Sequence, residues 1–419
     1  MSRVIDAEER TTCRTCGSDR LYRVLGFGPT PIADRLIRPG TAAEDDPLAP
    51  LTVLLCTDCW LMQIAETLPP ELLFGDDYPY YSSVSQTLID HSGRHVEHLI
   101  ADADLGKDSF VVELASNDGY LLDHFRVAGV PHLGIDPAPG PANAAIERGI
   151  DTWVDFFNPD VADRVLEERG PADVVIANNV LAHVADVHGF LAGIARMLKP
   201  DGRAAFEFPY VVELMENLQF DTIYHQHLCY FSLHSVQALL ARHGLVTTNV
   251  WTLPIHGGSL RVEARKAGEP SEAVSDMLAA ERSSGICSTA LYAQFADRVA
   301  ALRTEVREAV SKAKADGLRL VAYGAAAKGT TLLSFCGFDC ETLDYVVDRN
   351  EAKHGWLMPG SKLPILPVEK LLEEQPDLVL LLTWNFAAEI MSQQRAYLEK
   401  GGRFLVPIPH PRIADRAAA

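Results

Sequence analysis

Short β-rich runs alternate with amphipathic stretches in two separate parts of the chain, and this alternation restricts the possible folds most. The first series contains "SFVVELA", "HLGIDP", "IDTWVDFF", "ADVVIANN" and "RAAFEFP", with helical stretches such as "ADVHGFLAGIARMLKP" between them. Such an alternation predicts right-handed crossovers and a largely parallel sheet. The runs "GLVTTNVWTLP" and "GSLRVEARK" then indicate antiparallel strands at the edge of that sheet.

A second, smaller series follows a long helical stretch and contains "RLVAYGAAAKG", "TLDYVVD", "DLVLLLTW" and "RFLVPIP". The fold class is therefore predicted to be α/β, with two Rossmann-like units. The 419 residues suit several domains. We divide the chain into an N-terminal unit over 1–75, a central α/β unit over 76–270, a helical connector over 271–315 and a C-terminal α/β unit over 316–419.

Net charge and hydropathy exclude some classes of partner. The formal net charge of −20 argues against non-specific nucleic-acid binding, which needs clustered Lys and Arg, and against an anionic membrane surface. The charged start "MSRVIDAEERTTC" does not resemble a signal peptide, and no apolar run reaches the roughly 18 residues of a membrane span. We therefore expect a cytoplasmic protein without disulfides, and a monomer or small homo-oligomer.

Two Cys-x-x-Cys knuckles lie in the N-terminal unit, Cys13 with Cys16 and Cys56 with Cys59. Each knuckle can present two thiolates to one ion, so the two together can form a tetrahedral S4 site. Four thiolates leave no open position on the metal, which makes the predicted Zn²⁺ structural. The alternative is two unrelated redox or buried cysteine pairs.

The turn after the first strand of the central series, "VVELASNDGYLL", is small and contains a glycine. Such a turn lets a ligand approach the backbone at a helix N-terminus. It is not G-x-G-x-x-G, so a dinucleotide fits poorly. Acidic residues before the turn (Glu113) and at the end of the second strand (Asp136) suit a ribose and a cationic cofactor, S-adenosylmethionine. Another nucleotide remains the alternative.

The predicted cofactor site also takes in residues at the ends of strands three and four, where the adenine and the methionine part would lie. Its members are Glu113, Ala115, Ser116, Asn117, Asp118, Gly119, Tyr120, Leu121, Asp136, Pro137, Asp155, Phe156, Phe157, Asn178, Asn179 and His183.

Along the chain, the two knuckles are followed in order by "YPYYSS", "ELASNDGYLL", "YHQHLCYFS", "LPIHGGSLR", "AYGAAAKG" and "TWN". This order of motifs resembles that of the sugar C-methyltransferases of antibiotic biosynthesis, and the resemblance extends over nearly the whole chain. The resemblance implies an N-terminal zinc domain, a central S-adenosylmethionine domain and a C-terminal Rossmann-like domain that helps to hold a nucleotide sugar. It also implies the reaction: methylation of a carbon in a nucleotide-linked 4-keto-deoxysugar, such as a dTDP-sugar.

The resemblance implies roles for particular positions. Tyr78 and Tyr80 match tyrosines that reach into the active site, and Tyr224 and His227 match a tyrosine and the histidine base. Gln226 stands where the characterised sugar enzymes have glutamate, and His225 stands at a variable position. Segments near the sugar nucleotide contain His256, Gly257, Arg261, Tyr323, Lys328 and Asn385.

Residue types suggest how such a site would act. A carbon beside a ketone loses a proton when one base reaches the carbon and donors stabilise the enolate oxygen. A neutral histidine suits the first role, and tyrosines or an amide suit the second. We expect His227 to be the base, Tyr224 with Tyr78 or Tyr80 to steady the enolate, Gln226 to donate a hydrogen bond, and His225 to be a possible second base.

Several alternatives stay open at this level. The "YHQH" segment suits a solvated loop or, less well, a metal site, and Lys328 suits either a phosphate contact or a helix cap. The acceptor carbon is C3 or C5, because both lie next to a 4-ketone. The protein as a whole could methylate another small molecule, or could be a non-catalytic protein that keeps the cofactor fold.

Overall fold

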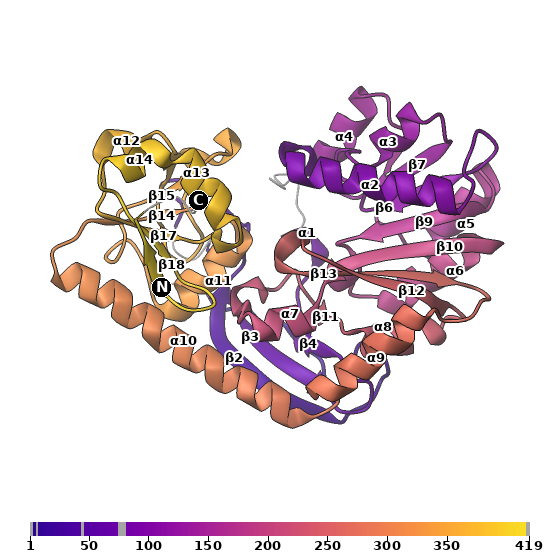
Figure 1. Cartoon of the computed structure of the whole chain (residues 1–419), viewed down its shortest axis with the longest axis horizontal. Coiled ribbons are helices and arrows are strands. Elements are labelled where there is room, and N and C mark those ends of the chain that lie inside the picture. Colours follow the sequence, from indigo (N-terminus) through magenta and orange to yellow (C-terminus); the bar gives the residue numbers. More distant parts are fainter. Residues whose placement is uncertain (1–2, 6, 43–45, 74–80, 416–419) are drawn as a thin grey trace.

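The computed structural model describes residues 3–5, 7–42, 46–73 and 81–415. It has two lobes, and the long helix α10 (Thr289–Ala315) runs along both of them (Figure 1). Apolar residues recur at every third or fourth position of α10, so that one face of the helix is buried along its whole length. That face consists of Tyr292, Phe295, Val299, Leu302, Val306, Val310 and Ala313.

The central unit is built on a seven-stranded sheet in the order β12-β13-β10-β9-β6-β7-β8, in which only β13 runs opposite to the others. The strand that starts the series, β6, therefore lies inside the sheet, between β9 and β7. The strands are β6 (Val111–Leu114), β7 (His132–Asp136), β8 (Thr152–Val154), β9 (Ala172–Asn178), β10 (Leu198–Pro209), β12 (Val246–Leu253) and β13 (Ser259–Arg265).

Helices cover both faces of this sheet, because both faces of its inner strands are apolar. Val111 and Ile176 share a core with α2 and α3, whereas Val112 and Val175 share the opposite core with α5 and α6. The helices of this unit are α2 (Gln86–Asp102), α3 (Leu122–Val127), α4 (Pro139–Glu147), α5 (Pro159–Glu168), α6 (Val187–Met197), α7 (Val211–Glu216) and α8 (Leu233–Ala241). Helix α9 (Glu272–Ser284), in the expected connector, packs against β12.

The N-terminal unit is a four-stranded antiparallel sheet in the order β11-β4-β3-β2. Three strands come from the unit itself: β2 (Leu21–Pro31), β3 (Leu48–Cys56) and β4 (Met62–Ile64). The fourth, β11 (Cys229–Tyr230), comes from the "YHQHLCYFS" segment of the central unit. That segment therefore lies between the two units. The N-terminal unit also holds a short ribbon of β1 (Glu8–Glu9) and β5 (Glu66–Thr67), and helix α1 (Pro70–Leu73).

The C-terminal unit is a six-stranded sheet in the order β16-β15-β14-β17-β18-β19, parallel except for β19. Its strands are β14 (Leu320–Tyr323), β15 (Val346–Asp348), β16 (Ile365–Pro367), β17 (Leu378–Leu381), β18 (Phe404–Val406) and β19 (Arg412–Ala414). Its helices are α11 (Ala327–Cys336), α12 (Lys370–Glu374), α13 (Ala387–Gln393) and α14 (Arg395–Glu399). Helix α11 packs against β2 and α10, and thus against the rest of the chain.

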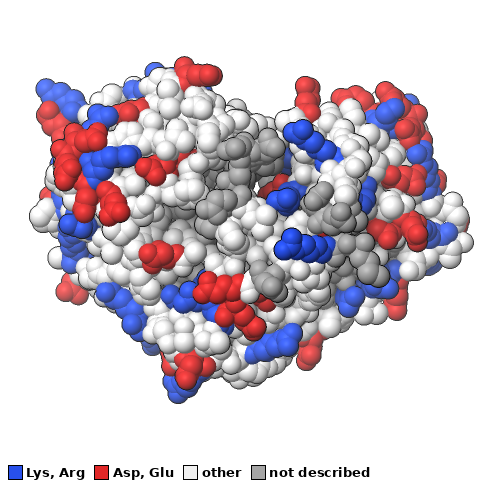
Figure 2. Space-filling view, turned by 180° about the vertical axis from the view of Figure 1, so that it is seen from behind, with Lys and Arg blue, Asp and Glu red and all other residues white. Residues whose placement is uncertain are grey.

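One continuous apolar core takes in residues of all three units, for example Leu51, Val112 and Leu380. On the face shown in Figure 2, acidic and basic side chains are interspersed. Within the described ranges, no helix is both long enough and apolar enough to cross a membrane.

Candidate functional site

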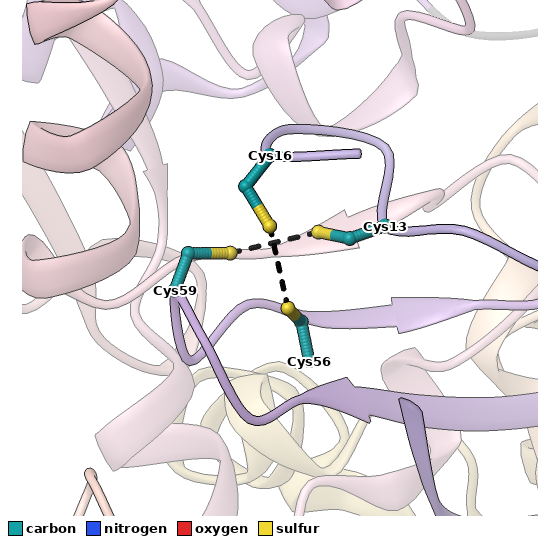
Figure 3. A group of neighbouring side chains, drawn as sticks. All are labelled: Cys13, Cys16, Cys56 and Cys59. Atoms are coloured by element: carbon teal, nitrogen blue, oxygen red, sulfur yellow. Dashed lines mark hydrogen bonds between the residues drawn. The ribbon is translucent and has the colours of Figure 1, made fainter. Parts of the chain in front are cut away.

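The four knuckle cysteines come together as the spacing predicted. Their sulfur atoms all lie within 4.8 Å of one another, with Cys13 Sγ 3.5 Å from Cys59 Sγ and Cys16 Sγ 3.4 Å from Cys56 Sγ (Figure 3). Four thiolates at about 2.3 Å from a central ion fit this span, so the residues suit tetrahedral Zn²⁺.

The long separation of the knuckles is explained by the hairpin between them. Leu21 at the start of β2 pairs with Cys56 at the end of β3, so the chain leaves the first knuckle and returns beside it. Within each knuckle a tight turn brings the sulfurs together: Gly17 N donates to Cys13 O and Trp60 N to Cys56 O, both at 3.0 Å. The hairpin thus takes the place of the short loop of a usual zinc finger.

The turn after β6 forms the predicted cofactor site at the carboxyl ends of the parallel strands. Asp136 holds it in place, because its Oδ2 accepts from Asn117 N and its Oδ1 from Ala138 N, both at 2.8 Å. Ala115, Asn117 and Gly119 all have positive φ, at 55°, 52° and 74°. A Cβ on Gly119 would lie 2.3 Å from Ile150 Cδ1, which explains the glycine.

Glu113 lies at the bottom of this site and is 1% exposed. Burial raises its pKa well above the usual value, and the nearby Asp136 and Asp118 carboxylates add to the increase. Its Oε2, like Ser116 Oγ, has no hydrogen-bond partner in the part of the chain that the structure describes. Buried acceptors of this kind fit a ligand that brings hydroxyl or ammonium donors, and S-adenosylmethionine brings both.

The remaining predicted cofactor residues divide into different surroundings. Phe157 packs edge-on against Phe190, with ring centroids 5.4 Å apart, whereas Phe156 is exposed and Asp155 Oδ2 lies 3.4 Å from Arg164 Nη1. Leu121 is completely buried in the core beneath the turn.

At the end of β9 the chain turns sharply toward His227, the predicted base. Asn179 has a φ of 53°, and its N donates to Glu207 O at 2.6 Å. His183, at the end of η3 (Leu181–His183), then lies edge-on to the His227 ring with centroids 4.7 Å apart. This contact joins the predicted cofactor residues to the predicted base.

The tyrosines Tyr78 and Tyr80 lie outside the described residues, but the segment that follows them contacts the cofactor turn. Ser82 N donates to Asn117 Oδ1 at 2.8 Å, and Ser83 N donates to Asp118 Oδ2 at 3.2 Å. Tyr81, which the sequence reasoning did not select, points its hydroxyl at Gly140, where a Cβ would approach it to 2.9 Å. Its place in the "YPYYSS" run was the available signal.

Tyr224 and His227 form a hydrogen-bonded pair. Tyr224 Oη lies 3.0 Å from His227 Nε2, and His227 Nδ1 lies 2.7 Å from Thr222 O. A carbonyl can only accept, so Nδ1 carries the proton and Nε2 of the neutral ring accepts from the phenol. Burial lowers the pKa of His227 to about 3, and the neighbouring His183 adds to the decrease. Burial likewise lowers the pKa of His183 to about 4.

His225 and Gln226 point away from this pair and into the N-terminal unit. His225 Nε2 donates to Pro50 O at 3.0 Å, and Gln226 Nε2 donates to Ala33 O at 2.6 Å. Both are nearly completely buried, at 1% and 3% exposure. The structure thus separates the four consecutive residues into two that pair with each other beside His183 and two that attach the segment to the zinc-binding unit.

The C-terminal unit reaches the same region through Lys328, at the start of α11. Lys328 Nζ donates to Asn385 Oδ1 and lies 4.4 Å from the centroid of the Trp384 ring. Burial lowers the pKa of this lysine to about 8, partly offset by the Asp221 carboxylate. Trp384 Nε1 in turn donates to Asp221 Oδ2 at 2.7 Å. The sequence reasoning did not select Trp384 or Asp221, although Trp384 lies in the quoted "TWN".

The other predicted substrate residues lie in less accessible places. Arg261 Nη2 donates to Glu207 Oε2 at 2.7 Å and lies 3.0 Å from His91 Nε2, within the central unit. Although burial alone would raise it, His91 and Arg261 hold the pKa of Glu207 at about 2. Glu207 was not among the predicted site residues. Like Glu113, it is an acid at the end of a buried strand, and this pattern could have identified it from the sequence.

His256, Gly257 and Tyr323 complete the predicted substrate residues. His256 and Gly257 form the turn η5 (Ile255–Gly257), with φ of 55° and 88°, and Gln219 Nε2 donates to Gly257 O at 2.6 Å. Tyr323 is buried in the C-terminal core against Phe404. The turn lies near His227, because His256 is among the groups that lower the His227 pKa, after burial itself.

A sheet of this order, with a ligand turn after β6 and acids at two strand ends, defines a Rossmann-like methyltransferase. Three family models match successive parts of the chain: a zinc binding domain (residues 13–74), a methyltransferase domain (93–250) and a C-methyltransferase C-terminal domain (254–409).

Among curated proteins, the chain is 40% identical over 404 residues to C-methyltransferase NovU of Streptomyces niveus, covering 96% of each. An ubiquinone biosynthesis O-methyltransferase of Azorhizobium caulinodans is 28% identical over 26% of this chain and 44% of its own. The solved magnesium protoporphyrin IX methyltransferase of Synechocystis PCC 6803, with bound SAM, is 15% identical, with a TM-score of 0.33 over 43% of this chain and 79% of its own.

The chain belongs to the C-methyltransferase family that includes NovU. It is therefore a methyltransferase that acts on carbon, with S-adenosylmethionine as the methyl donor and an N-terminal zinc-binding unit.

Proposed function

We propose that this enzyme methylates a carbon next to the ketone of a dTDP-linked 4-keto-deoxyhexose. The Tyr224–His227 pair is the observation that carries the proposal, because it offers a neutral base and a phenol donor next to His183 at the cofactor edge of the sheet. S-adenosylmethionine, held by the turn after β6, supplies the methyl group. The similarity to C-methyltransferase NovU over nearly the whole chain supports a carbon atom as the methyl acceptor.

The proton transfer falls to His227. Its Nδ1–H is held by Thr222 O, so Nε2 is the nitrogen that takes the proton from the carbon beside the ketone. The electrons of that C–H bond move into the enolate. S-adenosylmethionine would supply the methyl group to the enolate carbon as the ketone re-forms, and its sulfonium would leave as the thioether of S-adenosylhomocysteine. The Tyr224 hydroxyl, which lies against Nε2 before substrate binds, would turn to the enolate oxygen and donate to it.

A low pKa suits this base in one respect. At neutral pH a histidine whose pKa lies at about 3 is uncharged, with its single proton on Nδ1, so Nε2 is always ready to accept one. It is also a weak acceptor, so the charge of the enolate must be stabilised nearby. Among the described residues, the Tyr224 hydroxyl, 3.0 Å from Nε2, is the donor placed for that purpose.

The nucleotide end of the substrate would meet the C-terminal unit. Lys328 is a half-buried cation near Asp221, the residue before Thr222, and among the described residues no side chain caps the N-terminus of α11. A diphosphate placed there would accept from Lys328 Nζ and from backbone N–H groups. Lys328 would then be a substrate-binding residue, and its contact with Asn385 would orient its ammonium group.

Proton exchange in deuterated buffer tests the proposal. The enzyme is incubated with dTDP-4-keto-6-deoxyglucose, with and without S-adenosylmethionine. We expect exchange of an α-proton without the cofactor and a methylated sugar with it; NMR of the product distinguishes C3 from C5. The absence of both products would exclude this acceptor. A His227→Asn variant that keeps full exchange would exclude His227 as the base, and His225→Asn serves as the matched control.

A further inference from the structure

The segment that holds the base is itself held by the C-terminal unit. Thr222, whose carbonyl accepts from His227 Nδ1, is the last residue of η4 (Phe220–Thr222). On its outer side this turn contacts α11 and η7 (Trp384–Phe386): Thr331 Oγ1 donates to Ile223 O at 3.0 Å, and Trp384 Nε1 donates to Asp221 Oδ2 at 2.7 Å. Two side chains of the C-terminal unit thus bind the residues on either side of Thr222.

Asp221 is an unusual residue for an ordinary turn. It has no exposed surface, and its Oδ1 has no hydrogen-bond partner in the described ranges. A buried carboxylate is costly unless it is paired, so the Trp384 N–H and the nearby Lys328 charge largely determine where it lies. The position of Asp221 therefore depends on the docking of the C-terminal unit.

We propose that Trp384 is a positioning residue for His227. This inference rests on the proposed role of His227 as the base. By holding the Asp221 carboxylate, the indole N–H keeps the adjacent Thr222 carbonyl aimed at Nδ1. That carbonyl fixes the tautomer, and thereby leaves the lone pair on the nitrogen that faces Tyr224. Without the indole N–H the imidazole can rotate or change tautomer, and less of the enzyme holds a usable base.

The same tryptophan also contacts Lys328, whose ammonium lies over its ring at 4.4 Å. Trp384 thus contacts both the proposed anion-binding lysine and the carboxylate next to the base-holding carbonyl. This arrangement explains why a group from the last unit of the chain serves a reaction centre in the middle unit.

The variant Trp384→Phe tests the proposal, since it keeps an aromatic ring for packing and for Lys328 but removes the N–H donor. We expect α-proton exchange to slow about tenfold, as for the loss of one hydrogen bond to a charged group, with KM for the sugar nucleotide changed less than about twofold. Phe386→Leu, on the same turn but 40% exposed, is the matched control and should exchange at the wild-type rate.

A second readout does not depend on the identity of the acceptor. This readout is an NMR spectrum of protein labelled with 15N-histidine. The signal that disappears in the His227→Asn variant is assigned to His227, and its long-range 15N–1H couplings show which ring nitrogen carries the proton. We expect an Nδ1-protonated ring in the wild type and a mixture in Trp384→Phe. Slower exchange with an unchanged tautomer signal would overturn the proposal, as would an unchanged rate and signal. If the wild type shows no exchange, the proposed function fails, and the tautomer signal alone still decides the role of Trp384.

Discussion

The central and C-terminal units use the same device at the end of their second strand, yet the ligands that we propose for them carry opposite charges. In the central unit, the Asp136 carboxylate accepts from Asn117 N, in the turn after the first strand, and from Ala138 N, two residues after Asp136 itself. In the C-terminal unit, the Asp348 carboxylate likewise accepts from Ala325 N in the turn after the first strand, at 2.7 Å, and from Asn350 N, two residues after Asp348, at 2.8 Å. Both acids therefore hold together the two turns that a ligand would meet.

The difference lies in the strand beside that acid. Glu113 pairs with Gly134, two residues before Asp136, and Ala322 pairs with Val346, two residues before Asp348. The C-terminal unit thus has a small apolar residue at the position of Glu113, and it adds Lys328 at the start of the following helix. Similar backbones can be directed toward a cationic or an anionic ligand by one or two side chains.

Among the substitutions that test this comparison, replacing Glu113 should change ligand affinity most. In Glu113→Gln, affinity for S-adenosylhomocysteine is expected to fall about a hundredfold, because a buried acceptor of ligand donors becomes an amide that can satisfy only some of them. Affinity for dTDP should stay unchanged. Calorimetric titration with each ligand measures both, and Glu147→Gln, at the exposed end of α4, is the control. Equal losses for the two ligands would contradict a division of labour.

Replacing Lys328 should give the opposite pattern. Lys328→Met is expected to lower dTDP affinity about tenfold and to leave S-adenosylhomocysteine binding unchanged. Because burial places the Lys328 pKa at about 8, the lysine loses its charge as the pH rises through that value, so wild-type dTDP affinity should fall between about pH 7 and pH 9. The variant should show a flatter profile, and Lys370→Met, at the start of α12, should behave as wild type.

Replacing either of the two second-strand acids should lower the stability of the protein by a similar amount, although the two ligand sites differ. Asp136→Asn and Asp348→Asn should each lower the free energy of unfolding by about 1–2 kcal/mol, since an amide cannot accept two backbone N–H groups with both of its polar atoms. Denaturant titration of the ligand-free protein measures this. A loss confined to Asp136→Asn would show that Asp348 does not brace its unit.

The last effect concerns two histidines of the central unit. His183 and His227 have folded pKa values of about 4 and about 3, below the value of about 6.5 in an unfolded chain, so from about pH 6.5 downwards only the unfolded chain takes up these protons. Melting temperature should therefore fall as the pH decreases from 6.5 toward 4. His183→Asn should reduce that slope, whereas His410→Asn, at an exposed position, should leave it unchanged.

The sequence predicts the two α/β series and the four-cysteine cluster well, because strand periodicity and knuckle spacing are local properties. It does not predict that His225 and Gln226 face the N-terminal unit while Tyr224 and His227 pair with each other beside His183. The segment is a turn, in which His227 N donates to Tyr224 O at 2.9 Å, and side-chain directions in turns follow no simple period. The same limit applies to Asp221 and Trp384, which meet only because two distant units pack together.

The position of strand β11 in the chain has a consequence for folding during synthesis. The cysteine knuckles and β2–β4 are synthesised long before Cys229 and Tyr230, which complete the N-terminal sheet beside β4. Until then the outer edge of β4 has unpaired backbone groups, and such edges invite pairing with other chains. On the ribosome, the edge of β4 can therefore be covered only after the segment that contains Tyr224 and His227 has been synthesised.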